Sequence, residues 1–185
     1  MSGNISKSAE ESLNKIKARY PDPKSAVMPA LYIVQEELGV INDEGIAWVA
    51  SQLDIAPVHV MELATFYTMY YRKPVGKYHV QVCRTFSCGI CGSKKLVEKL
   101  KDRLRIAPGE VSEDGMWSYE QVECLGSCGT APMCEINDQY FENLTPEKLD
   151  ALMDRIEKEK PDLRYSTIRG KLGKGLQGAP KSEIR

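Results

Sequence analysis

The sequence lacks a long apolar run and any nucleotide-binding motif, and both absences exclude classes of function for this chain. No apolar stretch approaches the roughly 20 residues that span a bilayer, and residues 1–10 are polar, without the apolar segment of a secretory signal. No Gly-x-Gly-x-x-Gly follows an expected strand and no Walker-type lysine motif occurs. The formal net charge of -1 gives no reason to expect binding to nucleic acid. We therefore expect no direct membrane insertion, no nucleic-acid partner and no nucleotide pocket within this chain.

Histidine is scarce as well, with only His59 and His79 in 185 residues. A Rieske centre needs two histidine ligands beside two cysteines, and the Cys-x-His arrangement that would supply them is absent. We expect both histidines to be packing or surface residues.

Cysteine, by contrast, is plentiful. The chain has six cysteines and no export signal, which argues against a disulfide framework and favours metal or redox chemistry in a reducing compartment. We therefore expect a cytoplasmic site, or one that faces the cytoplasm. The six residues are Cys83, Cys88, Cys91, Cys124, Cys128 and Cys134.

Two short-spaced pairs stand out among these cysteines. Cys83-x4-Cys88 and Cys124-x3-Cys128 each lie where an expected strand gives way to a loop. Four thiolates on two loops can bind a [2Fe-2S] cluster, and the intervening glycines permit tight turns and close approach of backbone N–H groups to sulfur. We expect such N–H groups from Gly89, Gly126 and Gly129.

The first part of the chain, to about residue 72, is expected to be helical. The expected helices are one around Leu13 and Ile16, one from Ser25 to Leu38 ended by Gly39, one capped by Asp43, and one from Pro57 to Tyr70. The last helix ends in Phe66, Tyr67, Tyr70 and Tyr71, an aromatic cluster suited to a neighbouring protein.

From residue 77 the hydrophobic period changes to strands alternating with helices. We expect a strand over 78–83, a helix over 94–104, a strand over 117–124, a hairpin through Asn137 and Asp138, and a helix capped by Thr145 and Pro146. This β-α-β-β-α order, with the cysteine pairs at the ends of strands, is typical of a thioredoxin-like fold. The sequence thus predicts an α+β fold with a helical domain (1–75), a thioredoxin-like domain (76–160) and a flexible, net-positive, glycine-rich tail (161–185).

Several motifs resemble the small [2Fe-2S] subunit in the flavoprotein arm of NADH:quinone oxidoreductase, respiratory complex I. The resemblance covers residues 25–157 and depends on the segments 65–67, 74–83, 123–128 and 131–133. It implies a helical N-terminal bundle, a thioredoxin-like ferredoxin domain, and one cluster held by Cys83, Cys88, Cys124 and Cys128. It also implies a place in the peripheral arm, on the cytoplasmic side of a membrane-bound complex.

In this family FMN and NADH bind to a larger partner subunit, so the resemblance implies an electron carrier that is not catalytic alone. The implied partners are that flavoprotein subunit and other peripheral-arm subunits. Diaphorase subunits of NAD-linked hydrogenases and formate dehydrogenases share the resemblance. A free thioredoxin-like ferredoxin is a further alternative.

Cys91 and Cys134 depart from the family pattern and leave several alternatives open. Cys83, Cys88 and Cys91 have the spacing of a plant-type ferredoxin triplet, and Cys88-Gly-Ile-Cys91 could be a thioredoxin-type dithiol. Four thiolates could also hold structural zinc. We favour Cys91 and Cys134 as small, partly buried side chains, and a disulfide between them stays open.

Overall fold

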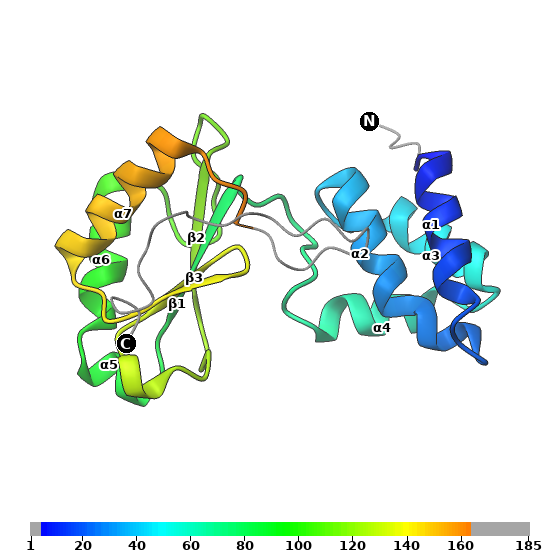
Figure 1. Cartoon of the computed structure of the whole chain (residues 1–185), viewed down its shortest axis with the longest axis horizontal. Coiled ribbons are helices and arrows are strands. Elements are labelled where there is room, and N and C mark those ends of the chain that lie inside the picture. The colour runs from blue at the N-terminus through cyan, green and yellow to red at the C-terminus, as the bar shows by residue number, and fades with distance from the viewer. Residues whose placement is uncertain (1–4, 164–185) are drawn as a thin grey trace. The chain divides into compact units, whose positions relative to one another are not determined.

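The computed structural model describes residues 5–163, which divide into two compact units at Pro74 and Val75 (Figure 1). The first unit is helical, as the sequence predicts. Its elements are α1 (Lys7–Lys17), the short 3-10 helix η1 (Pro23–Ala26), α2 (Val27–Leu38), α3 (Asp43–Leu53) and α4 (Pro57–Phe66).

Local capping explains where these helices begin and end, and it corrects two expected boundaries. Gly39 ends α2 with a left-handed φ of 73°, as expected. The N-cap of α3 is Asn42, whose side chain accepts the Gly45 N–H at 2.8 Å, so the expectation of Asp43 as the cap was wrong by one residue. Helix α4 ends at Phe66 instead of Tyr70, because the backbone turns extended at Tyr67.

The aromatic cluster at the end of α4 has two different environments. Tyr70 is buried, donates its hydroxyl to the Met28 carbonyl at 3.0 Å and packs edge-on against Tyr32. Phe66, in contrast, is 77% exposed. The cluster is therefore part core and part surface.

The second unit is built on a four-stranded mixed sheet with the order β2-β1-β3-β4. Strands β1 (Tyr78–Cys83) and β2 (Trp117–Val122) run parallel, whereas β3 (Cys134–Ile136) is antiparallel to β1 and pairs with β4 (Gln139–Phe141). The β3–β4 hairpin turns through Asn137, with a φ of 55°, and Asp138, as expected. Strand β2 ends at Val122, two residues short of the expected Cys124.

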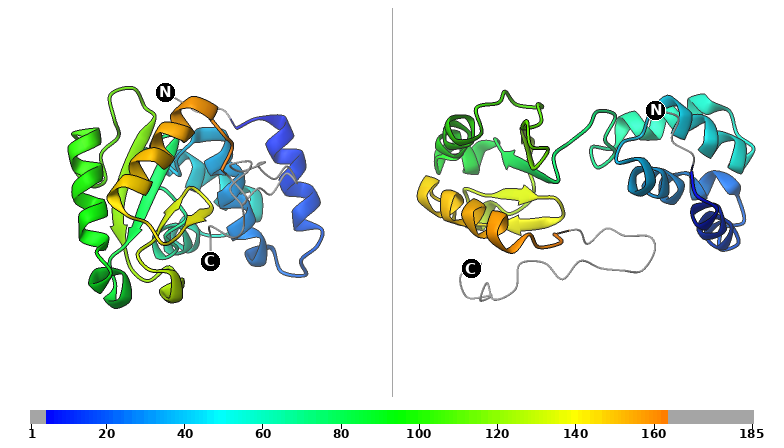
Figure 2. Two further views of the ribbon diagram at one scale, coloured as in Figure 1. Left: turned by 60° about the vertical axis from the view of Figure 1, so that its left-hand side comes forward. Right: turned by 90° about the horizontal axis from the view of Figure 1, so that it is seen from above.

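Helices α6 (Ser93–Leu104) and α7 (Pro146–Glu159) lie side by side against one face of this sheet (Figures 1 and 2). Thr145 caps α7 by accepting the Lys148 N–H, and Pro146 begins the helix, as the sequence predicts. Alternate residues of β1 point towards the helices. The shared core includes Val80, Val82, Leu96, Leu100, Leu149, Met153 and Ile156.

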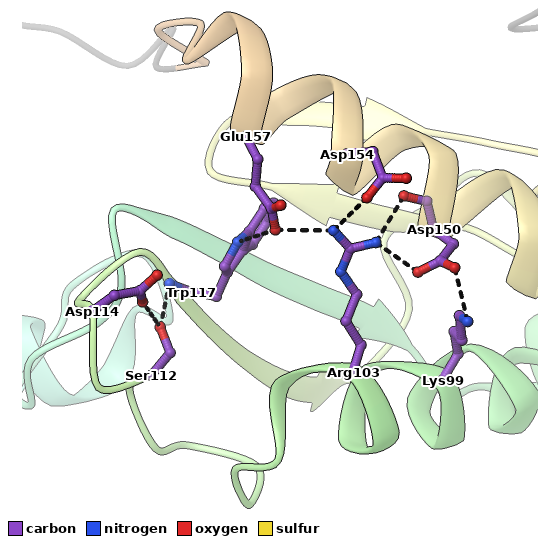
Figure 3. Close-up of polar contacts among 8 residues, drawn as sticks. All are labelled: Lys99, Arg103, Ser112, Asp114, Trp117, Asp150, Asp154 and Glu157. Carbon is purple, nitrogen blue, oxygen red and sulfur yellow. Dashed lines mark hydrogen bonds and ion pairs between the residues drawn. The ribbon is translucent and has the colours of Figure 1, made fainter.

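A polar clamp also joins the two helices (Figure 3). Arg103 of α6 donates to Asp150 at 2.6 Å, to Asp154 at 2.7 Å and to Glu157 at 3.0 Å on α7. Glu157 in turn accepts the indole N–H of Trp117 at 3.1 Å, so the clamp reaches β2. These hydrogen bonds set how the two helices sit against each other and against the sheet.

The first residues of the expected tail contact this unit. Leu163 is fully buried in the same core, and the Pro161 carbonyl accepts the Tyr78 hydroxyl at 2.9 Å. Residues 164–185 lie outside the described residues, so a flexible, net-positive segment there stays a prediction.

Candidate metal centre

The four predicted ligand cysteines gather at one end of the sheet. Because β1 and β2 are parallel, their carboxyl ends share an edge, and Cys83 lies opposite Val122 in the register. Cys88 is on the short helix α5 (Phe86–Ile90) directly after β1. Cys124 and Cys128 are on the loop after β2, whose end forms a short 3-10 helix, η2 (Cys128–Thr130), near α5 (Figure 1).

The first pair, Cys83 and Cys88, is buried, with each residue 2% exposed. Burial, followed by a hydrogen bond with Cys83, raises the pKa of Cys88 to about 11. Burial also opposes ionisation of Cys83, but hydrogen bonds from the Thr85 hydroxyl and from the backbone N–H of Leu125 bring its pKa below the ordinary value. The two thiols thus share one hydrogen bond, with Cys83 as the better thiolate.

The second pair, Cys124 and Cys128, is exposed, and its two Sγ atoms are 3.8 Å apart. The Gly126 N–H points at Cys124 Sγ at 3.4 Å, from a backbone with φ of 86° that favours glycine. This N–H lowers the pKa of Cys124, whereas the hydrogen bond with Cys124 raises the pKa of Cys128. Two thiolates on one tetrahedral metal, at about 2.3 Å each, lie about 3.8 Å apart, so this separation suits a shared metal.

The two pairs lie close to each other. The charge of Cys128 acts on Cys88, and the charge of Cys83 acts on Cys124. Over residues 5–163 no group of three or more His, Cys, Asp or Glu side chains is arranged to hold one metal ion. The thiols are instead arranged as two pairs, and a [2Fe-2S] cluster takes two protein ligands on each of its irons. The donor set therefore fits such a cluster.

The hydrogen-bond donors around these sulfurs differ in part from those expected. Gly126 donates as predicted, but the Gly89 N–H bonds to the Thr85 carbonyl inside α5. The additional backbone donors are Thr85 and Leu125, towards Cys83, and Met133, towards Cys88. Sequence reasoning missed all three, because these residue types carry no signal that their N–H groups face sulfur.

The two remaining cysteines have opposite environments. Cys134 is fully buried on β3 in the core under the helices, where burial strongly raises the pKa of its thiol. Cys91 follows α5 and is exposed, so the prediction of a partly buried side chain was wrong there. Cys91 and Cys134 are both free thiols in this structure, so they do not form a disulfide with each other. Cys88, the other member of the possible Cys88–Cys91 dithiol, hydrogen-bonds Cys83 and the Met133 backbone.

The histidines lie away from the cysteine pairs. His79 is 4% exposed, and its ring nitrogens lie 2.7 Å from the Ser118 hydroxyl and 3.0 Å from the Glu120 carboxylate. His59 lies 3.4 Å from Glu62 on the surface of α4. They are thus a packing residue and a surface residue, as expected.

No helix in the described part of the chain combines the length and apolarity needed to cross a lipid bilayer.

Comparison with known proteins gives one consistent family. The profile of the thioredoxin-like [2Fe-2S] ferredoxin family matches residues 13–157. The chain is 43% identical over 144 residues to a NADH-quinone oxidoreductase subunit of Rhizobium meliloti, covering 78% of this chain and 86% of that protein. It is 44% identical over 147 residues to NADH-quinone oxidoreductase subunit 2 of Thermus thermophilus, covering 78% of this chain and 81% of that protein.

A solved structure has a similar fold. The crystal structure of an NAD+-reducing [NiFe]-hydrogenase in the air-oxidized state aligns with a TM-score of 0.61 at 20% identity, over 71% of this chain and 23% of that chain. At this identity the likeness concerns the fold alone.

Proposed function

Because the chain belongs to the thioredoxin-like [2Fe-2S] ferredoxin family, we propose that it is the electron-transfer subunit of an NADH-quinone oxidoreductase. It carries one [2Fe-2S] cluster, bound by Cys83, Cys88, Cys124 and Cys128. The observation that supports this most directly is the meeting of two thiol pairs from two loops at one edge of the sheet, with 3.8 Å between the sulfurs of the second pair.

When bound, a [2Fe-2S] cluster accepts and releases one electron at a time. The chain's own groups hold its thiolate ligands and oppose their negative charge. The Gly126 N–H faces Cys124, and the Leu125 and Met133 N–H groups face Cys83 and Cys88. Such second-layer donors orient the ligands and tune a metal centre.

The two cysteine pairs differ in their exposure to solvent. Cys83 and Cys88 are buried, whereas Cys124 and Cys128 are exposed. An electron would therefore enter and leave on the side of the second pair, where a partner's cofactor can come close. The buried side keeps water away from the other two ligands.

The proposed partner is a larger subunit that binds FMN and NADH, in the peripheral arm on the cytoplasmic side of the complex. The relatives are named as subunits of NADH-quinone oxidoreductases, which supports a multi-subunit assembly. A diaphorase subunit of a NAD-linked hydrogenase is the second candidate, because the sequence motifs resemble such subunits too.

An iron and acid-labile sulfide assay of the anaerobically purified chain tests the cluster. We expect two irons and two sulfides per chain and a rhombic S = 1/2 electron paramagnetic resonance (EPR) signal after reduction, in keeping with one [2Fe-2S] cluster. Stoichiometric zinc without labile sulfide would falsify the proposal.

Serine substitutions test the ligands. Serine at Cys83, Cys88, Cys124 or Cys128 should lose or severely alter the cluster, because a soft anionic ligand is removed from a closed set. Cys91→Ser is the matched control and should keep the cluster. The opposite pattern, with loss in Cys91→Ser and retention in Cys128→Ser, would favour the ferredoxin-triplet arrangement.

A further inference from the structure

Thr85 lies between the two thiol pairs, and its hydroxyl does not make the N-cap hydrogen bond that its position in the chain predicts. It is the N-cap residue of α5, with extended backbone angles (φ -75°, ψ 175°). A threonine at an N-cap usually accepts a backbone N–H of the first helical turn with its hydroxyl. Here no such side-chain bond forms, so the hydroxyl is directed elsewhere.

The hydroxyl is directed at sulfur. Thr85 Oγ1 lies 3.2 Å from Cys83 Sγ, and the same hydroxyl lowers the pKa of Cys124 on the other loop. Among the α-helices, the other N-cap residues that have hydroxyls, Ser6 and Thr145, do cap their helices. Ser127, before the 3-10 helix η2, also makes no cap, and its hydroxyl contacts Thr130. The contrast indicates that the position of Thr85 between the sulfurs, and not the residue type, determines what its hydroxyl does.

We propose that Thr85 is a positioning residue for the cluster, whose hydroxyl donates an O–H···S hydrogen bond to the ligand sulfur of Cys83. A thiolate has no proton, so the hydroxyl must be the donor once metal is bound. The bond stabilises negative charge on the sulfur, and reduction of the cluster by one electron adds such charge. Thr85 therefore raises the reduction potential of the cluster.

The test compares three variants of the full chain: Thr85→Val, Thr85→Ala and Thr85→Ser. This inference rests on the proposed function, so iron and sulfide content is measured first. Valine keeps the β-branched shape and the extended backbone that Thr85 has, but it removes the donor. Serine restores the donor without the methyl group.

The reduction midpoint is then measured by EPR-monitored redox titration. We expect Thr85→Val and Thr85→Ala to disfavour reduction by about three- to tenfold in the equilibrium constant, the upper limit corresponding to about 59 mV for a one-electron couple. Thr85→Ser should stay close to the wild type. The EPR g-values of the two hydroxyl-free variants should also move, because the hydrogen bond changes the electron density on the ligand sulfur.

Three outcomes would overturn the inference. The first is an unchanged midpoint in Thr85→Val with full cluster content, and the second is an equal shift in Thr85→Ser and Thr85→Val. The third is loss of the cluster in both hydroxyl-free variants, since Thr85 would then hold the loop and not tune the centre. A wild-type chain without iron and sulfide would instead refute the proposed function, so the two failures can be told apart.

Discussion

At the scale of single residues, burial separates cysteines that the sequence leaves alike. Cys134 is enclosed in the core beneath α6 and α7, whereas Cys91 is exposed beyond α5. A thiol reacts as its thiolate, and burial disfavours that form in Cys134. The chemistry of each thiol therefore follows from its position in the fold.

This difference predicts the alkylation pattern of the cluster-loaded chain. With iodoacetamide at pH 8, Cys91 should be modified in the native chain, and Cys134 only after unfolding. Peptide mass spectrometry measures the two sites separately. In Cys91→Ser the fast-reacting thiol should disappear while the iron content is unchanged. Labelling of Cys134 as fast as Cys91 would contradict the packing described for β3.

At the scale of elements, Arg103 makes most of the polar contacts between α6 and α7, and Lys99 adds an ion pair with Asp150 at 2.9 Å. The side chain of Arg103 is 19% exposed and hydrogen-bonds three carboxylates of α7 (Figure 3). Without it, the carboxylates of Asp150, Asp154 and Glu157 would repel one another along one face of the helix. A charged hydrogen bond in a partly buried site contributes more than an exposed surface pair.

We expect Arg103→Met to lower the free energy of unfolding by about 2 kcal/mol, because it leaves three carboxylates without their common donor. Urea denaturation of the full chain, followed by circular dichroism, measures the change. Lys101→Met is the control: it removes an exposed cation from the same helix and should stay within about 0.5 kcal/mol of the wild type. Equal urea midpoints for both variants would show that the clamp adds no stability.

The same clamp predicts how stability depends on pH. Hydrogen bonds from Lys99 and Arg103 lower the pKa of Asp150 below its ordinary value of about 3.9. The ionised form is thus favoured by folding. Its stabilisation is complete above about pH 4 and is lost as the pH falls towards the lowered folded-state pKa.

Asp150→Asn should therefore be less stable than the wild type at pH 7, and the difference should shrink below about pH 4. Thermal unfolding at a series of pH values measures this, on cluster-free chains so that loss of acid-labile sulfide does not enter. Asp102→Asn changes an exposed carboxylate of α6 and serves as the control, with a curve parallel to the wild type. A difference that grows with acid would reverse the sign that we expect.

At the scale of the whole molecule, α4 exposes large apolar side chains that a partner subunit can cover. Its buried residues are Val60 and Ala64, yet Val58 is 57% and Phe66 is 77% exposed. Large exposed apolar side chains on one helix are typical of an interaction surface. The helical unit covers one side, so the other is available to the proposed flavoprotein subunit.

We expect Phe66→Ser to weaken that complex about tenfold or more, since large buried aromatic side chains supply much of the affinity of an interface. The measurement is titration of the purified flavoprotein subunit with the cluster-loaded chain, in parallel with cluster content. Tyr20→Ser replaces an aromatic residue, 40% exposed, that lies outside α4, and it should leave the affinity unchanged. Equal affinities of the two variants would exclude α4 from the interface.

Much of the fold and of the candidate site can be predicted from the sequence. The change of hydrophobic period marks the passage from helices to the sheet, and Gly39, Thr145 and Pro146 mark helix ends through short-range hydrogen bonds and steric limits. The spacing of Cys83 and Cys88, and of Cys124 and Cys128, indicates two loops that present thiolates. These features involve residues within about five positions of one another, so the sequence expresses them directly.

Only the tertiary structure decided how the distant parts act on each other. The parallel pairing of β1 and β2 brings Cys83 and Cys124 together, and only then does Thr85 lie between two sulfurs in place of capping its own helix. Arg103 likewise resembles any exposed helical arginine until α7 packs beside it. Local propensity depends on residues within one turn or strand. The partner of a hydroxyl or guanidinium depends instead on which distant segment is packed within hydrogen-bonding distance of it.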